Sequence, residues 1–495
     1  MLSAEQKMQV YKKIKEDKYF RKEYFKHFFY RYCQYYFREY YAFDTPPVLL
    51  KYYKALEEWK NVYFEWFRGC AKTTIAQMFL NYVIAYKLRR NIMWYSQTID
   101  NAEENLTYVA NTFIADTDWW VRFVNDFWNL YYPETVNRKW TKKIKRLDKF
   151  VTENDCYVRA MSLWTSPRWK NYTAPDWKFR PDLLIFDDVD TVASVQSQKK
   201  IDKNFEFMLN EVLWWTTSNT QIIFLWNTIY EDWLVPRFRE HIRGDKSREV
   251  IFLPIYDDFG RIVWDRFVET DEEAQRLNQN IREWNKKYTS LEWERRRLGS
   301  ISFEQNYLLK PFVQGQHIIT RDMIQRFNYR EDMKFDYLQI GIDPAVSEKQ
   351  GTDYFAISVC WFIKEKRYIL ECIALQGRDK NIKNSCQIIK QLYLKRQANK
   401  VIVETVAFQQ VLRTIFMSMW MAVKETKTHK DKTTRLMEKQ ILFENGEVFI
   451  ANNPWCDMLV EELLAFPNVE HDDRVDSMLF ALTNKTKTFF ISSVW

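Results

Sequence analysis

The chain has 495 residues, too many for one hydrophobic core, and at roughly 100–200 residues per domain this length predicts two to four domains. Hydrophobic residues make up 46% of it and charged residues 28%, a composition that fills folded cores and excludes extensive disorder. Lys and Arg exceed Asp and Glu by a net charge of +8, which suits a polyanionic partner but is weak evidence by itself.

The seven cysteines are scattered and odd in number, with no C-x-x-C pair and no histidine at metal-ligand spacing. We therefore expect a reducing compartment and no zinc site. The first residues lack the apolar core of a signal peptide, and no apolar run approaches the roughly 20 residues of a membrane span. The expectation is a cytoplasmic protein without a membrane partner.

Glycine is unusually rare in this chain and tryptophan unusually common. There are 9 Gly, where an average of roughly 7% would give about 35, and 21 Trp. Trp164, Trp169, Trp226 and Trp233 stand in turn-like contexts where glycine is the usual residue. One interpretation is that the source reads the codon UGA as glycine and the sequence was translated with UGA as tryptophan. The alternative is a protein that is truly rich in tryptophan.

The first half of the chain predicts a helical segment followed by an α/β domain. Residues 1–45 mix Lys, Arg and Glu with Tyr and Phe at helical spacing, which favours core-facing helices; contact with nucleic acid is the alternative. In residues 46–245 short apolar runs alternate with amphipathic stretches, a rhythm typical of a mostly parallel sheet flanked by helices. The expected strands cover residues 62–64, 91–96, 156–160, 183–186 and 222–225.

The second half predicts a connecting region and another α/β domain. Residues 246–330 are highly charged and are assigned to the connecting region. In residues 331–495 the pattern restarts, and its order is that of an RNase H-like fold. The expected elements are strands over 338–342, 355–362 and 367–374, a helix over 382–396, a strand over 401–404 and a closing helix that begins at residue 473.

Residues 67–74 read Phe-Arg-Gly-Cys-Ala-Lys-Thr-Thr and lie between an apolar strand and a helical run, the position of a phosphate-binding loop. Backbone N–H groups of such a loop hold phosphate oxygens, a lysine reaches the β- and γ-phosphates, and a hydroxyl binds Mg²⁺. Lys72 and Thr73 take those two roles. The consensus would place glycine at 66 and 71, where this chain has Trp66 and Ala71. The candidate nucleotide-binding residues are Arg68, Gly69, Cys70, Ala71, Lys72, Thr73, Thr74 and Asp187.

A second element supports the loop: residues 181–188 form an apolar run that ends in two carboxylates, as a Walker B strand does. Asp187 would bind the Mg²⁺, and either Asp188 or Asp190 would orient the attacking water. The plain alternative is a strand that runs into an acidic turn. Arg68 would neutralise charge on the γ-phosphate as an arginine finger in cis, unless it is an ordinary surface arginine.

The second domain supplies carboxylates where strands end and where the last helix begins. Asp343 follows one strand, Glu404 ends another, and Asp473 and Asp476 share a face of the closing helix. Mg²⁺ and Mn²⁺ prefer oxygen ligands, and two such ions about 3.5–4 Å apart can activate water and stabilise the leaving oxygen of a phosphodiester. We expect Asp343, Glu404 and Asp473 to be catalytic metal ligands assisted by Asp476, with Asp353 a weaker candidate.

In this order the motifs resemble those of the large terminase subunit of tailed bacteriophages, over roughly residues 55–490. The similar segments are 68–74, 166–169, 180–188 and 225–228 on the ATPase side, and 341–345, 403–404 and 471–476 on the nuclease side. The resemblance implies an α/β protein with an N-terminal P-loop (ASCE-type) ATPase domain and a C-terminal RNase H-like nuclease domain. It also assigns Asn227 and Thr228 to the motif that couples hydrolysis to movement.

The family's activity is ATP-driven packaging of double-stranded DNA into a procapsid, with metal-dependent cutting of concatemeric DNA. The resemblance implies ATP and Mg²⁺ as cofactors, with Mn²⁺ an alternative at the nuclease site. It implies double-stranded DNA, a small terminase subunit and the portal protein of the procapsid as partners, and a homo-oligomeric ring on the portal. The expected location is the cytoplasm of the infected bacterial host, not the mature virion. The alternatives are an ATP-gated repair or defence nuclease and a decayed prophage terminase without activity.

Overall fold

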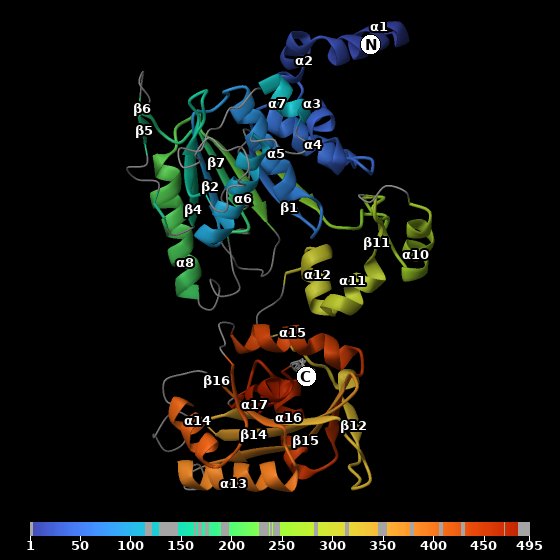
Figure 1. The fold of residues 1–495 in the computed structure, drawn as a ribbon, viewed down its shortest axis with the longest axis vertical. Coiled ribbons are helices and arrows are strands. Elements are labelled where there is room, and N and C mark those ends of the chain that lie inside the picture. Colours follow the sequence, from blue (N-terminus) through green and yellow to red (C-terminus); the bar gives the residue numbers. More distant parts are fainter. Residues whose placement is uncertain are drawn as a thin grey trace, which may run out of the picture. The chain divides into compact units, whose positions relative to one another are not determined.

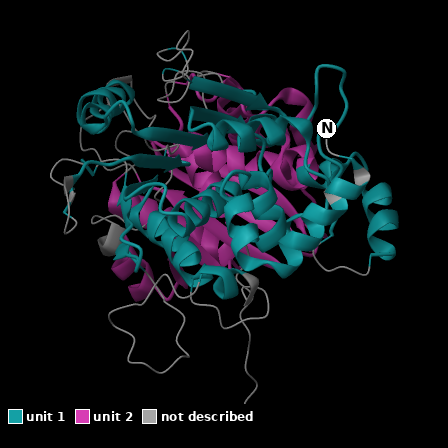
Figure 2. Cartoon of the chain, turned by 90° about the horizontal axis from the view of Figure 1, so that it is seen from above, with its two compact units in different colours: residues 1–294, 303–312 teal, residues 295–302, 313–495 magenta. Residues whose placement is uncertain are grey.

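The computed structural model describes residues 3–113, 121–127, 147–162, 165–166, 171–173, 178–189, 198–226, 237, 240, 248–281, 286–311, 316–344, 354–376, 381–404, 409–426, 431–469 and 471–483. The chain divides into two compact units, residues 1–294 with 303–312 and residues 295–302 with 313–495 (Figure 2). None of the helices in the described ranges has the length and apolarity that a bilayer-spanning segment requires.

The first unit begins with short helices rich in aromatic residues (Figure 1). Phe29, Tyr32 and Tyr36 of the third helix are buried, as helical spacing predicts for a core-facing segment, whereas no side chain described in the first helix is buried. The helices are α1 (Ala4–Glu16), α2 (Lys18–Phe25), α3 (Phe29–Tyr36), the 3₁₀ helix η1 (Arg38–Tyr40) and α4 (Pro47–Glu57).

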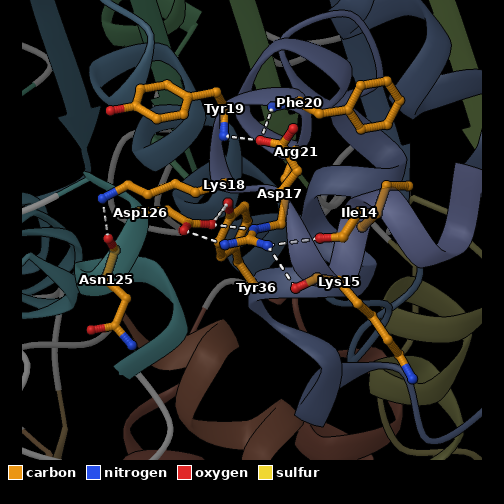
Figure 3. A network of polar contacts seen from close by, with 10 residues as sticks. All are labelled: Ile14, Lys15, Asp17, Lys18, Tyr19, Phe20, Arg21, Tyr36, Asn125 and Asp126. Carbon is orange, nitrogen blue, oxygen red and sulfur yellow. Dashed lines mark hydrogen bonds and ion pairs between the residues drawn. The ribbon is translucent and has the colours of Figure 1, made fainter.

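A buried ion pair joins these helices to α7 (Val121–Phe127), as Figure 3 shows. The Arg21 guanidinium contacts the Asp126 carboxylate twice, Nε to Oδ2 at 2.6 Å and Nη2 to Oδ1 at 2.5 Å. The Tyr36 hydroxyl donates to the same carboxylate at 2.5 Å, and Arg21 also donates to the carbonyl oxygen of Ile14 at 2.7 Å. The Asp126 side chain is only 1% exposed, and these donors offset the cost of burying it.

The first unit is built on a seven-stranded sheet with the order β3-β4-β2-β7-β8-β1-β9. Every neighbouring pair is parallel except β3 with β4, which confirms the predicted parallel sheet. Strand β9 falls within residues 246–330, the region that the sequence assigns to a connection. The strands are β1 (Asn61–Trp66), β2 (Asn91–Ser96), β3 (Lys149–Val151), β4 (Tyr157–Ser162), β7 (Leu183–Asp187), β8 (Gln221–Trp226) and β9 (Arg248–Leu253).

Aromatic rings stack across one face of this sheet, one ring from each of four adjacent strands. Tyr95 stacks on Phe186 with ring centroids 4.7 Å apart, Phe186 on Phe224 at 4.3 Å, and Phe224 on Tyr63 at 5.0 Å. Such cross-strand pairs hold the register of neighbouring strands. The helices of this layered unit are α5 (Lys72–Ala85), α6 (Ile99–Thr112) and α8 (Gln198–Phe207), the last followed by η3 (Met208–Val212) and η4 (Leu213–Trp215).

Small elements follow β9 along the chain. The helices are α10 (Asp271–Gln279), α11 (Leu291–Leu298) and α12 (Ser300–Tyr307), and a pair of two-residue strands, β10 (Phe267–Val268) and β11 (Thr289–Ser290), lies among them. A second such pair, β5 (Tyr172–Thr173) and β6 (Lys178–Phe179), belongs to the segment before β7.

The second unit contains another seven-stranded sheet, with the order β12-β18-β15-β14-β13-β16-β17. The antiparallel meander β13-β14-β15 with β16 parallel to β13 is the predicted RNase H-like order. The strands are β12 (Gln325–Phe327), β13 (Tyr337–Asp343), β14 (Phe355–Ile363), β15 (Lys366–Leu375), β16 (Lys400–Glu404), β17 (Val423–Thr426) and β18 (Val448–Ala451). The helices are η5 (Arg321–Met323), α13 (Ile382–Lys395), α14 (Gln409–Ser418), α15 (Lys432–Glu444), α16 (Pro454–Ala465) and α17 (Asp473–Ala481).

Helices cover both faces of the sheet in the second unit (Figure 1). Side chains along each strand point alternately to one face and to the other. Ile340 and Ile342 of β13 belong to the apolar core that also contains residues of α13 and α14. The intervening residues face α17: the Gln339 side chain donates to the carbonyl oxygens of Ala481 at 2.6 Å and Thr483 at 2.7 Å. The odd-numbered residues of β13 therefore lie on the face of the sheet that packs against α17.

Replacing Asp126 by Asn should lower the free energy of unfolding of the first unit by about 3–5 kcal/mol, because it leaves the Arg21 guanidinium buried without its counter-ion. Urea denaturation of the full chain measures this. The control is Glu23→Gln, which removes an exposed pair with His27 and should change stability by about 0–1 kcal/mol. Equal destabilisation by both changes would contradict the structural role of the buried pair.

Candidate active sites

The predicted phosphate-binding loop connects β1 to α5, as the sequence indicates. Its backbone turns through two left-handed residues, Gly69 at φ +82° and Ala71 at φ 65°. Glycine adopts that conformation without strain, which explains why the consensus has glycine at the position of Ala71. Trp66 is not part of the turn: it is the last residue of β1, fully buried, with its ring against Phe64 at 3.6 Å between centroids.

The loop is anchored by residues that sequence reasoning did not identify. The Arg68 N–H donates to the carbonyl oxygen of Asn306 at 2.7 Å, and the buried Phe67 ring packs against Phe267 and Tyr307 at centroid distances of 5.4 Å and 6.3 Å. No motif marks these contacts, since the partners lie about 200 residues further along the chain. The Arg68 side chain itself is exposed.

The lysine and hydroxyl of the loop meet the two carboxylates of the Walker B strand. Lys72 Nζ lies 2.5 Å from Asp188 Oδ1, and the Thr73 hydroxyl donates to Asp187 Oδ1 at 2.9 Å. Strand β8 lies between β1 and β7, so the two motifs come from strands that are not neighbours. The structure thus brings Lys72, Thr73 and Asp187, which the sequence assigns to ATP and Mg²⁺, together with Asp188, one of the two candidates for orienting the attacking water.

Burial decides the charge balance of this site. Burial, and next the charge of Asp188, raise the pKa of Asp187 to about 7, while Lys72 and the Thr73 hydroxyl act in the opposite direction. A second cation beside Asp187 would therefore stabilise its ionised form.

Two further loop residues were predicted to bind the nucleotide. Thr74 is half-buried in the first turn of α5. Burial raises the pKa of the Cys70 thiol to about 12, which leaves that thiol inert.

The second site lies where β13 and β16 end. Asp343 and Glu404 are the last residues of these two parallel strands, and both share the strand face that meets α17. Asp473 is the first residue of α17, and its carboxylate accepts the N–H of Tyr354 at 2.9 Å. Hence the fold gathers the predicted acids at one edge of the sheet.

The acids of this site influence one another's charge. Burial raises the pKa of Asp343 to about 8, and the charges of Asp476, Asp473 and Glu404 add to that rise, whereas Lys432 opposes it. Burial also raises the pKa of Glu404, with Asp476 adding to the rise. Among the described residues no three Asp, Glu, His or Cys side chains are already arranged as the ligands of one ion. The donor chemistry suits a hard divalent cation, which would relieve this mutual repulsion.

Asp476, expected to assist in metal binding, has both carboxylate oxygens in ion pairs. Arg435 Nη2 lies 2.5 Å from Oδ1, and Lys432 Nζ lies 2.7 Å from Oδ2. Lys432 Nζ is also 2.6 Å from Asp472 Oδ1. Sequence reasoning missed both cations because they belong to a charged stretch, residues 424–435, that reads like any solvated surface segment.

Several residues singled out in the sequence lie outside the described ranges. They are Asp190, Asn227, Thr228, Asp353, Trp164, Trp169 and Trp233. The choice between Asp188 and Asp190 as the base therefore stays open. Asp188, whose φ is 44°, is the candidate that the structure describes.

Comparison with known proteins agrees with this architecture. Residues 340–485 match the sequence model of the family described as terminase RNaseH-like domain. Three crystal structures of the large terminase from a thermophilic bacteriophage each align with 88% of this chain at 9% identity. The alignment covers 96% of the terminase chain in the first structure, with a TM-score of 0.53. It covers 98% of the terminase chain in the complex with ADP, with a TM-score of 0.54, and 98% in the complex with ATP-gamma-S, with a TM-score of 0.53. The chain has the fold of a phage large terminase.

The expected fold class is thereby confirmed: a P-loop domain in which one strand separates the two nucleotide motifs, followed by an RNase H-like domain. The match to the terminase family model covers the whole second sheet except β12 and the start of β13. Asp343, Glu404 and Asp473 all lie within it. No curated protein sequence matches the chain.

The acidic site predicts a pH dependence of stability. Because the pKa of Asp343 is raised to about 8 in the folded chain, the folded state keeps a proton that the unfolded chain releases near pH 4. The stability that this group contributes is present at low pH and is lost as the pH rises towards about 8. Without divalent cations, the free energy of unfolding of the second unit should fall between about pH 4 and pH 8, and less steeply in Asp343→Asn.

Urea denaturation in EDTA at several pH values measures this effect. Glu462, whose burial raises its pKa to about 7, contributes equally to both proteins and cancels in the comparison. Identical pH profiles for the wild type and Asp343→Asn would show that Asp343 does not carry the predicted shift.

Proposed function

We propose that this chain is the large terminase subunit of a tailed phage, a DNA-packaging ATPase joined to a metal-dependent endonuclease. One observation carries the proposal: a single chain combines a Walker-type site with an acid-lined site at the strand ends of an RNase H-like sheet. Similarity over 88% of the chain to the large terminase of a thermophilic bacteriophage, whose structures include complexes with ADP and ATP-gamma-S, supports it.

At the first site the chain's own residues bind and polarise ATP. The backbone of residues 69–73 holds phosphate oxygens, and Lys72 exchanges its contact with Asp188 for the β- and γ-phosphates. The released Asp188 then orients the attacking water, and the exposed Arg68 reaches the γ-phosphate. Thr73 and Asp187 would hold Mg²⁺, which neutralises phosphate charge; their hard oxygen donors and the raised pKa of Asp187 fit that ion.

At the second site Asp343, Glu404 and Asp473 would hold Mg²⁺ or Mn²⁺, which supplies an activated water and stabilises the leaving oxygen of the phosphodiester. The Tyr354 N–H fixes the Asp473 carboxylate, and β13 and β16 fix the other two. Asp476 anchors Lys432 and Arg435 instead of facing solvent.

The partners follow from this activity. They are double-stranded DNA, the small terminase subunit, the portal protein of the procapsid and further copies of the chain in a ring on the portal, within the infected bacterial cell. The net charge of +8 agrees with a polyanionic substrate. ATP-dependent uptake of DNA into empty procapsids distinguishes packaging from an ATP-gated repair or defence nuclease.

Separate inactivation of the two sites tests the proposal. Lys72→Ala should abolish ATP hydrolysis, by at least about 100-fold as expected for loss of a phosphate-stabilising donor, yet spare Mn²⁺-dependent nicking of plasmid DNA. Asp343→Ala should abolish nicking and spare the ATPase. Steady-state phosphate release and gel-based nicking measure the two activities. If each change removed both activities while the proteins remained folded, two separable sites would be ruled out; an inactive wild type would favour a decayed terminase.

A further inference from the structure

We propose that Lys432 binds a phosphate of the DNA at the acidic site of the second unit. This inference rests on the proposed nuclease function and adds a substrate-binding residue to it. Lys432 is the first residue of α15, and its position is fixed by the cap before it: Asp431 Oδ1 accepts the Thr434 N–H at 2.9 Å.

The ammonium group of Lys432 has a donor left for a substrate. It contacts Asp472 Oδ1 at 2.6 Å and Asp476 Oδ2 at 2.7 Å, and a lysine ammonium carries three N–H donors. Among the described residues these two carboxylates are its hydrogen-bond acceptors. The contacts with Asp472 and Asp476 fix the direction of the third N–H, so a phosphate oxygen that binds there meets a positive charge already in position.

Arg435, one turn further along α15, does not have this freedom. Its side chain is 16% exposed against 36% for Lys432, and its guanidinium lies over the Phe480 ring at 5.3 Å. The Nε and Nη1 groups of Arg435 are shielded from solvent. Arg435 therefore acts as the buried counter-ion of Asp476, and Lys432 is the cation that solvent and substrate can reach.

The charge of the site explains why such a cation is needed. Asp343, Glu404, Asp473 and Asp476 lie within electrostatic range of one another, and a DNA phosphate that approaches them is repelled. Divalent ions offset part of that charge only when they are bound. Lys432, which lowers the pKa of Asp343 and is in reach of the same acids, offsets it permanently.

Salt dependence of DNA binding tests this role without any bound metal. In EDTA, the affinity of the full chain for a short duplex is measured by fluorescence anisotropy over a range of NaCl concentrations. Each phosphate contact contributes about 0.9 to the slope of log K against log salt, so Lys432→Gln should reduce that slope by about one and weaken binding. Lys432→Arg should restore both, and nicking in Mn²⁺ should fall in Lys432→Gln and recover in Lys432→Arg.

The matched control is Lys395→Gln, which removes the same charge from an exposed position in the last turn of α13 and should leave slope and nicking unchanged. If Lys432→Gln melts like the wild type and keeps the wild-type slope, Lys432 has a purely structural role and the inference is wrong. If Lys432→Gln keeps the wild-type slope while the wild type nicks DNA, only the role of Lys432 is contradicted and the proposed function is not. A folded wild type that neither binds nor nicks DNA would instead contradict the proposed function itself.

A different observation supports a second inference: we infer that residues 59 and 420 are glycine in the natural protein, encoded by UGA. Trp59 has φ 55° and Trp420 has φ 65°. Each lies two residues beyond the last residue of a helix, α4 or α14, and precedes a residue whose N–H returns to the last turn. Lys60 donates to the carbonyl oxygen of Ala55 at 3.1 Å, and Met421 to that of Phe416 at 3.1 Å. This is the C′ position of a Schellman motif, which glycine occupies most often.

Tryptophan gains little at position 420. The Trp420 side chain is 94% exposed, so no burial offsets its left-handed backbone, and Trp59 is half-buried under the Arg89 guanidinium at 4.3 Å. Lys87 and Gln397 occupy the same kind of position with φ 51°, so the inference rests on these two turns combined with the 9 Gly against 21 Trp of the whole chain.

Tandem mass spectrometry of the protein purified from its natural source decides this inference. Peptides that cover residues 59 and 420 should carry glycine at both positions, with peptides that contain no Trp serving as internal controls for the assigned sequence. Tryptophan at both positions would overturn the inference, and tryptophan at one would overturn it for that position.

Discussion

Helix α17 can lie directly on strand β13 only because residue 341 is glycine. A Cβ on Gly341 would stand 2.2 Å from the backbone nitrogen of Ala481 and 2.3 Å from the carbonyl oxygen of Ser477, distances that no real side chain shows. Asp343 shares that face of β13 two residues further on, so this close approach also carries Asp473, at the start of α17, towards the strand end. The acidic site therefore depends on a backbone contact that involves none of the acids.

Both candidate sites use the carboxyl ends of parallel strands, where side chains from neighbouring strands meet at one edge. At each site burial raises the pKa of the carboxyl group that ends a central strand, Asp187 to about 7 and Asp343 to about 8, and a lysine opposes that rise. Lys72 reaches the first site from the loop after β1, and Lys432 reaches the second from α15. Each site thus combines carboxylates with a built-in lysine, an arrangement suited to binding phosphate together with a divalent ion.

The sequence predicts the parts of the fold whose signals are local. Buried central strands appear as apolar runs, and the strand-end acids and the Lys72 loop follow from their position beside such runs. Edge strand β17 was missed because Val-Lys-Glu-Thr is half-buried and polar. Lys432 and Arg435 could not be identified, since their partner Asp476 lies about 40 residues away and a charged run looks the same whether it faces solvent or a site. The buried pair of Arg21 with Asp126 was hidden for the same reason.

The acids of the second unit are expected to bind a divalent cation. Anomalous diffraction from a crystal of the full chain soaked with Mn²⁺ tests this directly. An anomalous peak should appear among the carboxylates of Asp343, Glu404 and Asp473, with Lys432 still paired to Asp476. A fully soaked crystal with no peak at these residues, or with the three carboxylates turned away from one another, would contradict it.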